Sequence, residues 1–153
     1  MIKRTGISAL LAGAVFSLLA ACQSGDPELN RKEGAAFLAE NAKKPGILTT
    51  ASGLQYQVIS EGNGIKPKAE DNVTVNYKGA FISGSEFDSG DGISFPLSGV
   101  IAGWTEGLQL MKEGAKYRFY IPPELGYGES GAGRTIPPNA TLVFDVELVK
   151  VNR

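Results

Sequence analysis

The stretch Val73-Thr-Val-Asn-Tyr77 places an apolar side chain at every second position. The same alternation returns in Leu142-Val-Phe-Asp-Val-Glu-Leu148, and it also marks residues 54–58 and 117–121. Successive side chains of a β-strand point to opposite faces, so a period of two predicts strands that bury one face. The sequence therefore predicts a sheet of several strands with one side packed on a core.

Glycine, serine, asparagine and aspartate, which favour turns, gather between these strands. The predicted turns fall at residues 61–64, 83–84, 89–92 and 131–133. One short helix fits between Gly103 and Met111, where Trp104 and Leu108 can share an apolar face. These elements predict an α+β fold, an antiparallel twisted β-sheet wrapped over one short α-helix.

A further short helix is predicted ahead of the sheet. Asp26 suits the N-cap position, Pro27 the first helical position and Glu28 the first turn. The pair Pro45-Gly46 ends this helix. Its apolar stripe is thin and rich in alanine, so we expect it to bury little and to act as a spacer or a weak docking element.

The N-terminus has the features of an export signal. Lys3 and Arg4 give a positive start, and residues 7–21 form a run of 15 mostly apolar residues. This run is shorter than the ~20 residues that a membrane-spanning helix needs, and it ends in small residues. We therefore expect residues 1–21 to be a signal peptide.

The only cysteine of the chain directly follows this segment, in Leu19-Ala20-Ala21-Cys22. The motif resembles the lipobox of bacterial lipoproteins, in which the cysteine is lipidated and becomes the first mature residue. Gln23, in place of aspartate, favours an exported protein anchored in the outer membrane and facing the periplasm. An ordinary secretory signal followed by a free cysteine is the alternative.

The length of 153 residues suits a single domain, for which ~100–200 residues are usual. We expect a signal peptide over 1–21, a lipidated tether with the short helix over 22–46, and a folded domain over 47–153.

Composition excludes several kinds of chemistry. The chain has no histidine and one cysteine, which rules out a Ser-His-Asp triad, histidine-ligated zinc and a cysteine cluster. Its 15 basic residues match 16 acidic ones, and removal of Lys3 and Arg4 leaves 13 basic residues. Without a basic excess, nucleic acid is not an expected partner. We also expect no metal site and no cofactor.

Aromatic residues lie in loops and at the ends of predicted elements, where a pure core would favour aliphatic ones. They belong to five motifs that follow one another along the chain: Val73–Gly79, Phe87–Ser89, Gly99–Leu108, Ile121–Gly128 and Ile136–Leu148. This ordered series resembles the catalytic domain of the FKBP-type peptidyl-prolyl cis-trans isomerases, from about Ser52 to Val151. Residues 33–56 resemble the end of the N-terminal region in the macrophage infectivity potentiator type.

The resemblance implies a pocket of mainly aromatic side chains, with Trp104 as the floor for a substrate proline ring. Asp88 and Tyr127 would be its polar members, and the Ile101 backbone N–H a further donor. The catalytic residues carried over are Asp88, Tyr127 and Phe87. The substrate-binding residues carried over are Tyr77, Phe95, Val100, Ile101, Trp104, Ile136 and Phe144.

The family's activity implies faster rotation about X-Pro bonds of exported, proline-containing polypeptides, and binding of the family's macrolide inhibitors. Tyr127 would hold the carbonyl oxygen, and Asp88 would face the carbonyl carbon or organise neighbouring hydroxyls. A lipid-anchored chaperone or binding module with the same fold and little turnover is the alternative. The joint presence of Asp88, Phe87, Trp104 and Tyr127 favours the enzyme.

Three features depart from the family's pattern. Residues 89–94 contain no arginine or lysine that would pair with Asp88, and Thr135 stands where an apolar residue is common. About 30 residues separate Cys22 from the domain, too few for the family's long dimerisation region. We therefore expect a lipid-tethered monomer.

Overall fold

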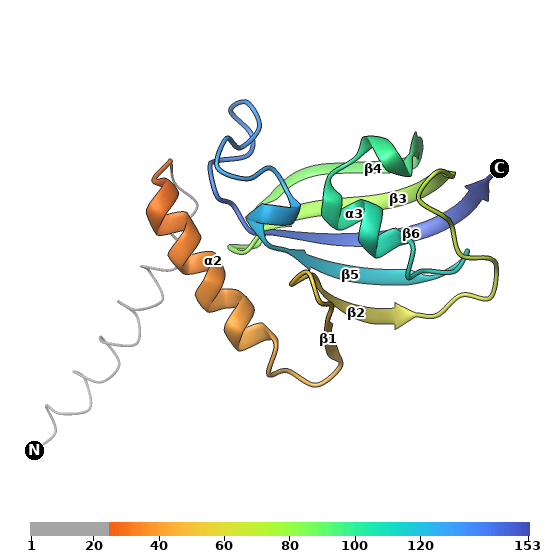
Figure 1. Ribbon diagram of the computed structural model, residues 1–153, viewed down its shortest axis with the longest axis horizontal. Helices are drawn as coiled ribbons and strands as arrows, with labels where there is room; N and C mark the ends of the chain where they lie inside the picture. The colour runs from red at the N-terminus through yellow and green to blue at the C-terminus, as the bar shows by residue number, and fades with distance from the viewer. Residues whose placement is uncertain (1–24) are drawn as a thin grey trace, which may run out of the picture.

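A computed structural model of the chain describes residues 25–153, so the predicted signal peptide and Cys22 lie outside the described residues. Six strands form one sheet in the order β1-β2-β5-β6-β3-β4, and every neighbouring pair is antiparallel. The strands are β1 (Ile47–Thr49), β2 (Gln55–Ser60), β3 (Asn72–Phe81), β4 (Glu86–Pro96), β5 (Lys116–Ile121) and β6 (Leu142–Asn152). The predicted α+β fold is confirmed (Figure 1).

The sheet curves around the helix α3 (Ala102–Leu108), which packs on one of its faces (Figure 1). Two glycines let the helix approach this closely. A Cβ atom at Gly103 would lie 2.9 Å from the Ile121 side chain, and one at Gly107 would lie 2.6 Å from the ring of Phe119. Between helix and sheet lies the core, where Phe119 is fully buried.

The strand β4 forms one edge of the sheet, and its pairing with β3 is interrupted twice. The register shifts between Val75 and Tyr77 and again between Gly79 and Ala80. Such irregularities bend an edge strand and change where its side chains point. The 3-10 helix η1 (Leu97–Gly99) then leads from β4 to α3, and residues of β4 and of the start of α3 line the same hollow.

A second 3-10 helix, η2 (Pro123–Leu125), follows β5. The loop after η2 runs to β6 and is closed by an isolated bridge between Ala132 and Ile136. This loop carries Tyr127 to the same end of the sheet as the hollow.

The helix α2 (Pro27–Asn41) was expected from its cap, and Asp26 does accept hydrogen bonds from the Glu28 and Leu29 backbone N–H groups, at 3.0 and 3.2 Å. It lies across one end of the sheet (Figure 1). Its buried residues are the polar Asn30 and Asn41 and the small Gly34, and the ring of Phe37 packs against Tyr120 with centroids 6.0 Å apart. Within residues 25–153, no helix has the length and apolar character that crossing a membrane requires.

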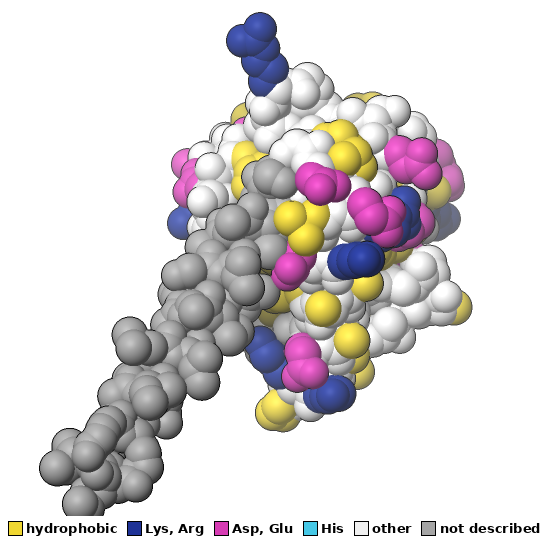
Figure 2. All heavy atoms as spheres, turned by 90° about the vertical axis from the view of Figure 1, so that its left-hand side faces the viewer, with side chains coloured by type: hydrophobic (Ala, Val, Ile, Leu, Met, Phe, Trp, Pro, Cys, Tyr) yellow, Lys and Arg dark blue, Asp and Glu magenta, His cyan; other side chains and the backbone are white. Residues whose placement is uncertain are grey.

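The surface on the α2 side carries both signs of charge. Figure 2 shows acidic and basic side chains next to one another on this face, without a large area of one sign. Arg31 pairs with Glu124 at 3.5 Å and with Glu129 at 3.7 Å, and Lys43 pairs with Glu40 at 3.3 Å. Interleaved charges of this kind offer no continuous cationic surface to a polyanion.

Candidate functional site

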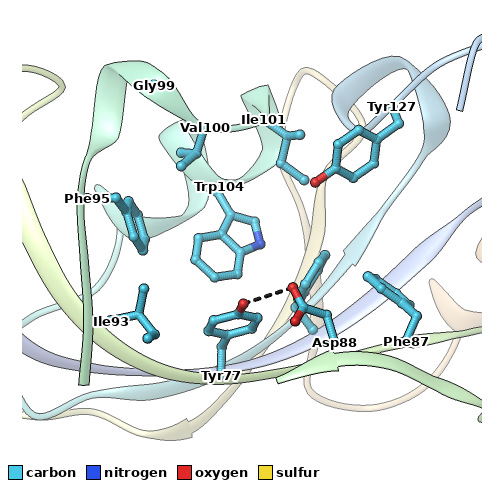
Figure 3. Close-up of a pocket in the computed structure, with 11 residues that line it drawn as sticks. Tyr77, Phe87, Asp88, Ile93, Phe95, Gly99, Val100, Ile101, Trp104 and Tyr127 are labelled. Carbon is cyan, nitrogen blue, oxygen red and sulfur yellow. Dashed lines mark hydrogen bonds between the residues drawn. The ribbon is translucent and has the colours of Figure 1, made fainter. Parts of the chain in front are cut away.

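A cavity of about 430 Å³ lies between β4, the start of α3 and the Tyr127 loop (Figure 3). Most of the side chains around it are aromatic or aliphatic. Its lining consists of Tyr77, Phe87, Asp88, Ile93, Phe95, Gly99, Val100, Ile101, Trp104, Tyr127 and Phe144. A cavity with many apolar groups and few polar ones suits a small apolar group whose orientation is fixed by one or two hydrogen bonds.

Trp104 lies at the bottom of the cavity and is 6% exposed. Its indole ring contacts Tyr77 and Phe144 edge to face, with centroids 5.2 and 5.1 Å apart, and Phe95 at 5.4 Å. Phe87 meets Phe144 in a further T-shaped contact at 5.6 Å. Each ring is thus supported by another ring in a favourable geometry, so the floor and walls of the cavity pack as one aromatic cluster.

Glycine at position 79 makes room for two of these rings. A Cβ atom there would lie 2.6 Å from the Phe144 ring and 2.9 Å from the Phe87 ring. Any larger residue at this position of β3 would force both rings to shift. The absence of a side chain at Gly79 therefore allows the Phe87 and Phe144 rings of the pocket wall to lie against β3.

The polar side of the cavity is a hydrogen-bonded pair. The Tyr77 hydroxyl donates to Asp88 Oδ2 at 2.8 Å (Figure 3). Burial, followed by the hydrogen bond to Asp88, raises the pKa of Tyr77 to about 12. Tyr77 is therefore a neutral donor at physiological pH. Among the described residues that line the cavity, Asp88 alone carries a charge.

The raised pKa of Tyr77 predicts a loss of stability in alkali. The folded-state pKa of about 12 lies above the usual value of 10, so the stabilisation is complete below pH 10 and lost as pH rises through 12. We expect the free energy of unfolding to fall more steeply between pH 10 and 12 in the wild type than in Tyr77→Phe. Urea titrations across this range measure the difference.

Burial also raises the pKa of Tyr117, but this affects the wild type and Tyr77→Phe equally. Identical pH profiles would contradict the assignment.

Tyr127 and the beginning of α3 close the other side of the cavity. Tyr127 is 39% exposed, and Figure 3 shows its hydroxyl directed toward the space above Trp104. Ile101 caps the N-terminus of α3, and Val100 lies beside it on the rim. A ligand on Trp104 would therefore meet the Tyr127 hydroxyl near the Ile101 backbone.

Nine of the ten pocket residues expected from the sequence surround this one cavity, and their individual roles remain predictions. Ile136 is the exception, because it is absent from the lining. Its side chain is 5% exposed, and its backbone bridges to Ala132 with hydrogen bonds of 2.9 and 3.0 Å. Ile136 belongs to the hydrophobic core.

Two lining residues were missed by the sequence analysis, Ile93 and Gly99. Ile93 precedes Phe95 by two positions on β4, so the alternation of strand side chains could have placed both on one face. Gly99 contributes backbone only, and no sequence signal for this contact exists.

Among the described residues that line the cavity there is no histidine, cysteine, serine, threonine or lysine. The described residues hold no group of three histidine, cysteine, aspartate or glutamate side chains that could bind a metal ion. The polar side-chain groups of the lining are the Asp88 carboxylate, the phenols of Tyr77 and Tyr127 and the indole N–H of Trp104. Such a site can desolvate a small ring and hydrogen-bond a neighbouring carbonyl.

Comparison with known sequences gives two family matches. Residues 63–149 match the profile of FKBP-type peptidyl-prolyl cis-trans isomerase, and residues 8–58 match the domain amino-terminal to it. A probable FKBP-type isomerase FkpA from Neisseria meningitidis is 56% identical over 82% of this chain and 48% of its own. The peptidyl-prolyl cis-trans isomerase Mip of Coxiella burnetii is 48% identical over 81% of this chain and 56% of its own. This chain spans about half the length of the curated relatives it matches.

Solved structures agree with these matches. FkpA from Escherichia coli aligns with a TM-score of 0.80 and 43% identity, covering 99% of this chain and 71% of that one. A peptidyl-prolyl cis-trans isomerase from Pseudomonas syringae pv. tomato aligns with a TM-score of 0.81 and 38% identity, covering 85% of this chain and 98% of that one.

Proposed function

The chain belongs to the FKBP-type peptidyl-prolyl cis-trans isomerase family, and from this premise we propose that its cavity accelerates rotation about X-Pro peptide bonds. The observation that carries the proposal is the aromatic cavity over Trp104, with the hydrogen-bonded Tyr77–Asp88 pair on one side and Tyr127 on the other. It has the size and apolar character to hold a proline ring together with the preceding carbonyl.

Rotation is slow because resonance gives the peptide bond partial double-bond character, with a barrier of ~18–20 kcal/mol. For an X-Pro bond the free energies of the two planar forms differ by only ~0.5–1 kcal/mol. Both forms are therefore populated at equilibrium, and the slow step is the rotation between them. Twisting the bond removes resonance and shrinks the carbonyl dipole. An apolar cavity penalises the planar, polar form more than the twisted one, and it thereby binds the transition state better than the ground state.

The proposed roles follow from where each group lies. Trp104 supports the proline ring, and Phe87, Phe95 and Phe144 exclude water from it. The Tyr127 hydroxyl and the Ile101 N–H donate to carbonyl oxygens of the bound peptide. Asp88 accepts from Tyr77 at 2.8 Å, which holds its carboxylate beside the reacting carbonyl.

Tyr127→Phe separates catalysis from binding. A hydrogen bond made in the transition state contributes about 0.5–1.5 kcal/mol, so we expect kcat/KM to fall roughly 3- to 10-fold. Exchange rates of an X-Pro peptide measured by NMR give turnover, and fluorescence of Trp104 gives the affinity for the same peptide. Weaker turnover with affinity retained supports the isomerase. Unchanged turnover would remove Tyr127 from the mechanism, and binding without turnover in the wild type would indicate a chaperone or binding module.

The wider setting of the enzyme rests on the N-terminal sequence. We propose that residues 1–21 are a signal peptide, that Cys22 carries lipid, and that residues 22–46 tether the domain of residues 47–153. The protein would then be a monomer on the outer membrane, facing the periplasm. Its substrates would be exported polypeptides that contain proline, and macrolide inhibitors of the family would compete with them for the cavity. Mass spectrometry of the mature N-terminus and fractionation of the envelope test the anchor.

A further inference from the structure

The helix α2 contacts the loops that carry the cavity's Tyr127, although it does not line the cavity itself. Its N-terminal half lies against residues 137–140, just before β6, and against the loop around η2 (Figure 1). Asn30 Nδ2 donates to the Pro138 carbonyl at 2.9 Å, and Arg31 reaches Glu124 on η2 at 3.5 Å. The family resemblance gives this helix no part in the site.

Asn139 joins the helix to the loop. Its side chain is bonded on both ends: Nδ2 donates to the Pro27 carbonyl at 3.1 Å, and Oδ1 accepts from Arg31 Nη2 at 3.1 Å. The residue is 5% exposed and has a φ of 58°, a conformation that residues other than glycine seldom adopt. Asparagine tolerates this left-handed conformation better than most residues, and the bonds to Pro27 and Arg31 tie its side chain to α2.

The backbone of Asn139 in turn holds the residue next to Tyr127. Its N–H donates to the Gly128 carbonyl at 2.8 Å, the shortest of the bonds that fix this turn. Further bonds in this turn are Gly128 N–H to the Pro123 carbonyl at 2.9 Å, Gly126 N–H to the same carbonyl at 3.0 Å and Gly131 N–H to the Tyr127 carbonyl at 3.1 Å. The ion pair of Arg31 with Glu129, at 3.7 Å between exposed groups, adds little.

We propose that Asn139 is a positioning residue, through which α2 fixes the Tyr127 hydroxyl over the floor of the cavity. The catalytic consequence rests on the proposed isomerase function, whereas the position of Tyr127 does not. In this view α2 is part of the active-site scaffold. If α2 were detached, the cavity would keep its aromatic floor, but the Tyr127 hydroxyl would no longer be aligned to donate to a substrate carbonyl.

The opposite end of α2 supplies a matched control. Asn41 Nδ2 donates to Gln55 Oε1 at 2.8 Å, and Gln55 Nε2 donates to the Leu38 carbonyl at 2.9 Å. Asn41 is as deeply buried as Asn30, both being 1% exposed, but its bonds lead to β2 and not to the Tyr127 loop. Asn41→Ala therefore loosens the helix without touching the proposed connection.

The test uses the full chain in detergent micelles, with 3-fluorotyrosine as the reporter of Tyr127. Asn139→Gly keeps the backbone N–H and accepts the positive φ, and it removes both side-chain bonds to α2. We expect the fluorine signal of Tyr127, assigned by its loss in Tyr127→Phe, to shift and broaden. We expect kcat/KM to fall roughly 3- to 10-fold, and Tyr127→Phe to cause little further loss in the Asn139→Gly background. Asn41→Ala should leave the signal and kcat/KM unchanged.

Arg31→Ala is a second variant, at a partly exposed position. It removes one of the two side-chain bonds of Asn139 together with the ion pairs to Glu124 and Glu129, which join exposed groups and add little. It should shift the Tyr127 signal in the same direction by a smaller amount. The proposal is overturned if the Tyr127 signal is unchanged in both variants, or if Asn139→Gly and Tyr127→Phe lower kcat/KM independently. A wild type without turnover would refute the isomerase function, and the fluorine signal would still decide the role of Asn139.

Discussion

Trp104→Leu is expected to lower kcat/KM for X-Pro isomerisation by roughly 10- to 50-fold while the protein stays folded. The indole is the floor on which the proline ring would lie, and it contacts Tyr77, Phe95 and Phe144 with centroids 5.1 to 5.4 Å apart. Burying each methylene of that ring contributes about 0.8 kcal/mol, and a leucine covers only part of the ring. Water that enters the space left by the indole would also reduce the preference of the cavity for the twisted transition state.

Phe119→Leu is the control for this change. Phe119 belongs to the same core and is fully buried, but it does not line the cavity. Both variants should lose stability, as urea titrations can show, and only Trp104→Leu should lose catalytic efficiency. Equal kcat/KM values for the two variants, measured on the same peptide, would show that Trp104 serves the core alone.

Phe144→Ala is expected to reduce the free energy of unfolding by about 3–5 kcal/mol, the usual cost of truncating a buried phenylalanine. Phe144 is 4% exposed on β6 and contacts Trp104 and Phe87 edge to face, at 5.1 and 5.6 Å. Its removal leaves a cavity that joins the existing pocket and frees two further rings. Unfolding in urea, followed by circular dichroism, measures the loss.

Phe119→Ala should cost a similar amount, because its ring is equally buried. The two variants differ in the pocket, so only Phe144→Ala should weaken the binding of an X-Pro peptide at a temperature where both are folded. A stability loss below about 1 kcal/mol for Phe144→Ala would contradict the packing described for the aromatic cluster.

The central strands could be predicted from the sequence because each buries one face. Alternation in residues 73–77 and 142–148 corresponds to β3 and β6, which pair in the middle of the sheet. The two edge strands of the sheet, β1 and β4, show no such run of alternation in the sequence. β1 has only three residues, and β4 contains glycine, serine and aspartate and is largely exposed. Exposed edge strands are commonly polar and irregular, so their pattern resembles that of a turn.

The helix α2 shows a second limit of hydrophobic patterns. Its start followed from Asp26 and Pro27, whereas it ends at Asn41, ahead of the stop expected at Pro45-Gly46. Its thin apolar stripe predicted a spacer or weak docking element. The structure instead buries Asn30 and Asn41 in hydrogen bonds to Pro138 and Gln55. Polar docking depends on partners far away in the sequence, and no local period reveals it.

Periodicity alone did not locate the cavity. The resemblance to a family placed nine residues around it, because the order of five motifs is far more specific than any single aromatic residue. Ile136 is absent from the lining of the cavity and is buried in the core, bridged to Ala132, so its expected contact with substrate stays a prediction. Ile93 was overlooked because its strand had not been recognised.

The central claim is that this cavity catalyses X-Pro rotation, and the most direct measurement is the isomerisation rate of a short X-Pro peptide with the wild-type chain. The chain from Gln23 onward can be used once circular dichroism shows it to be folded. We predict a rate clearly above the uncatalysed exchange, proportional to protein concentration and abolished by a macrolide ligand of the family that carries a pipecolyl ring. A folded protein that binds this ligand but leaves the exchange rate at its uncatalysed value would contradict the account.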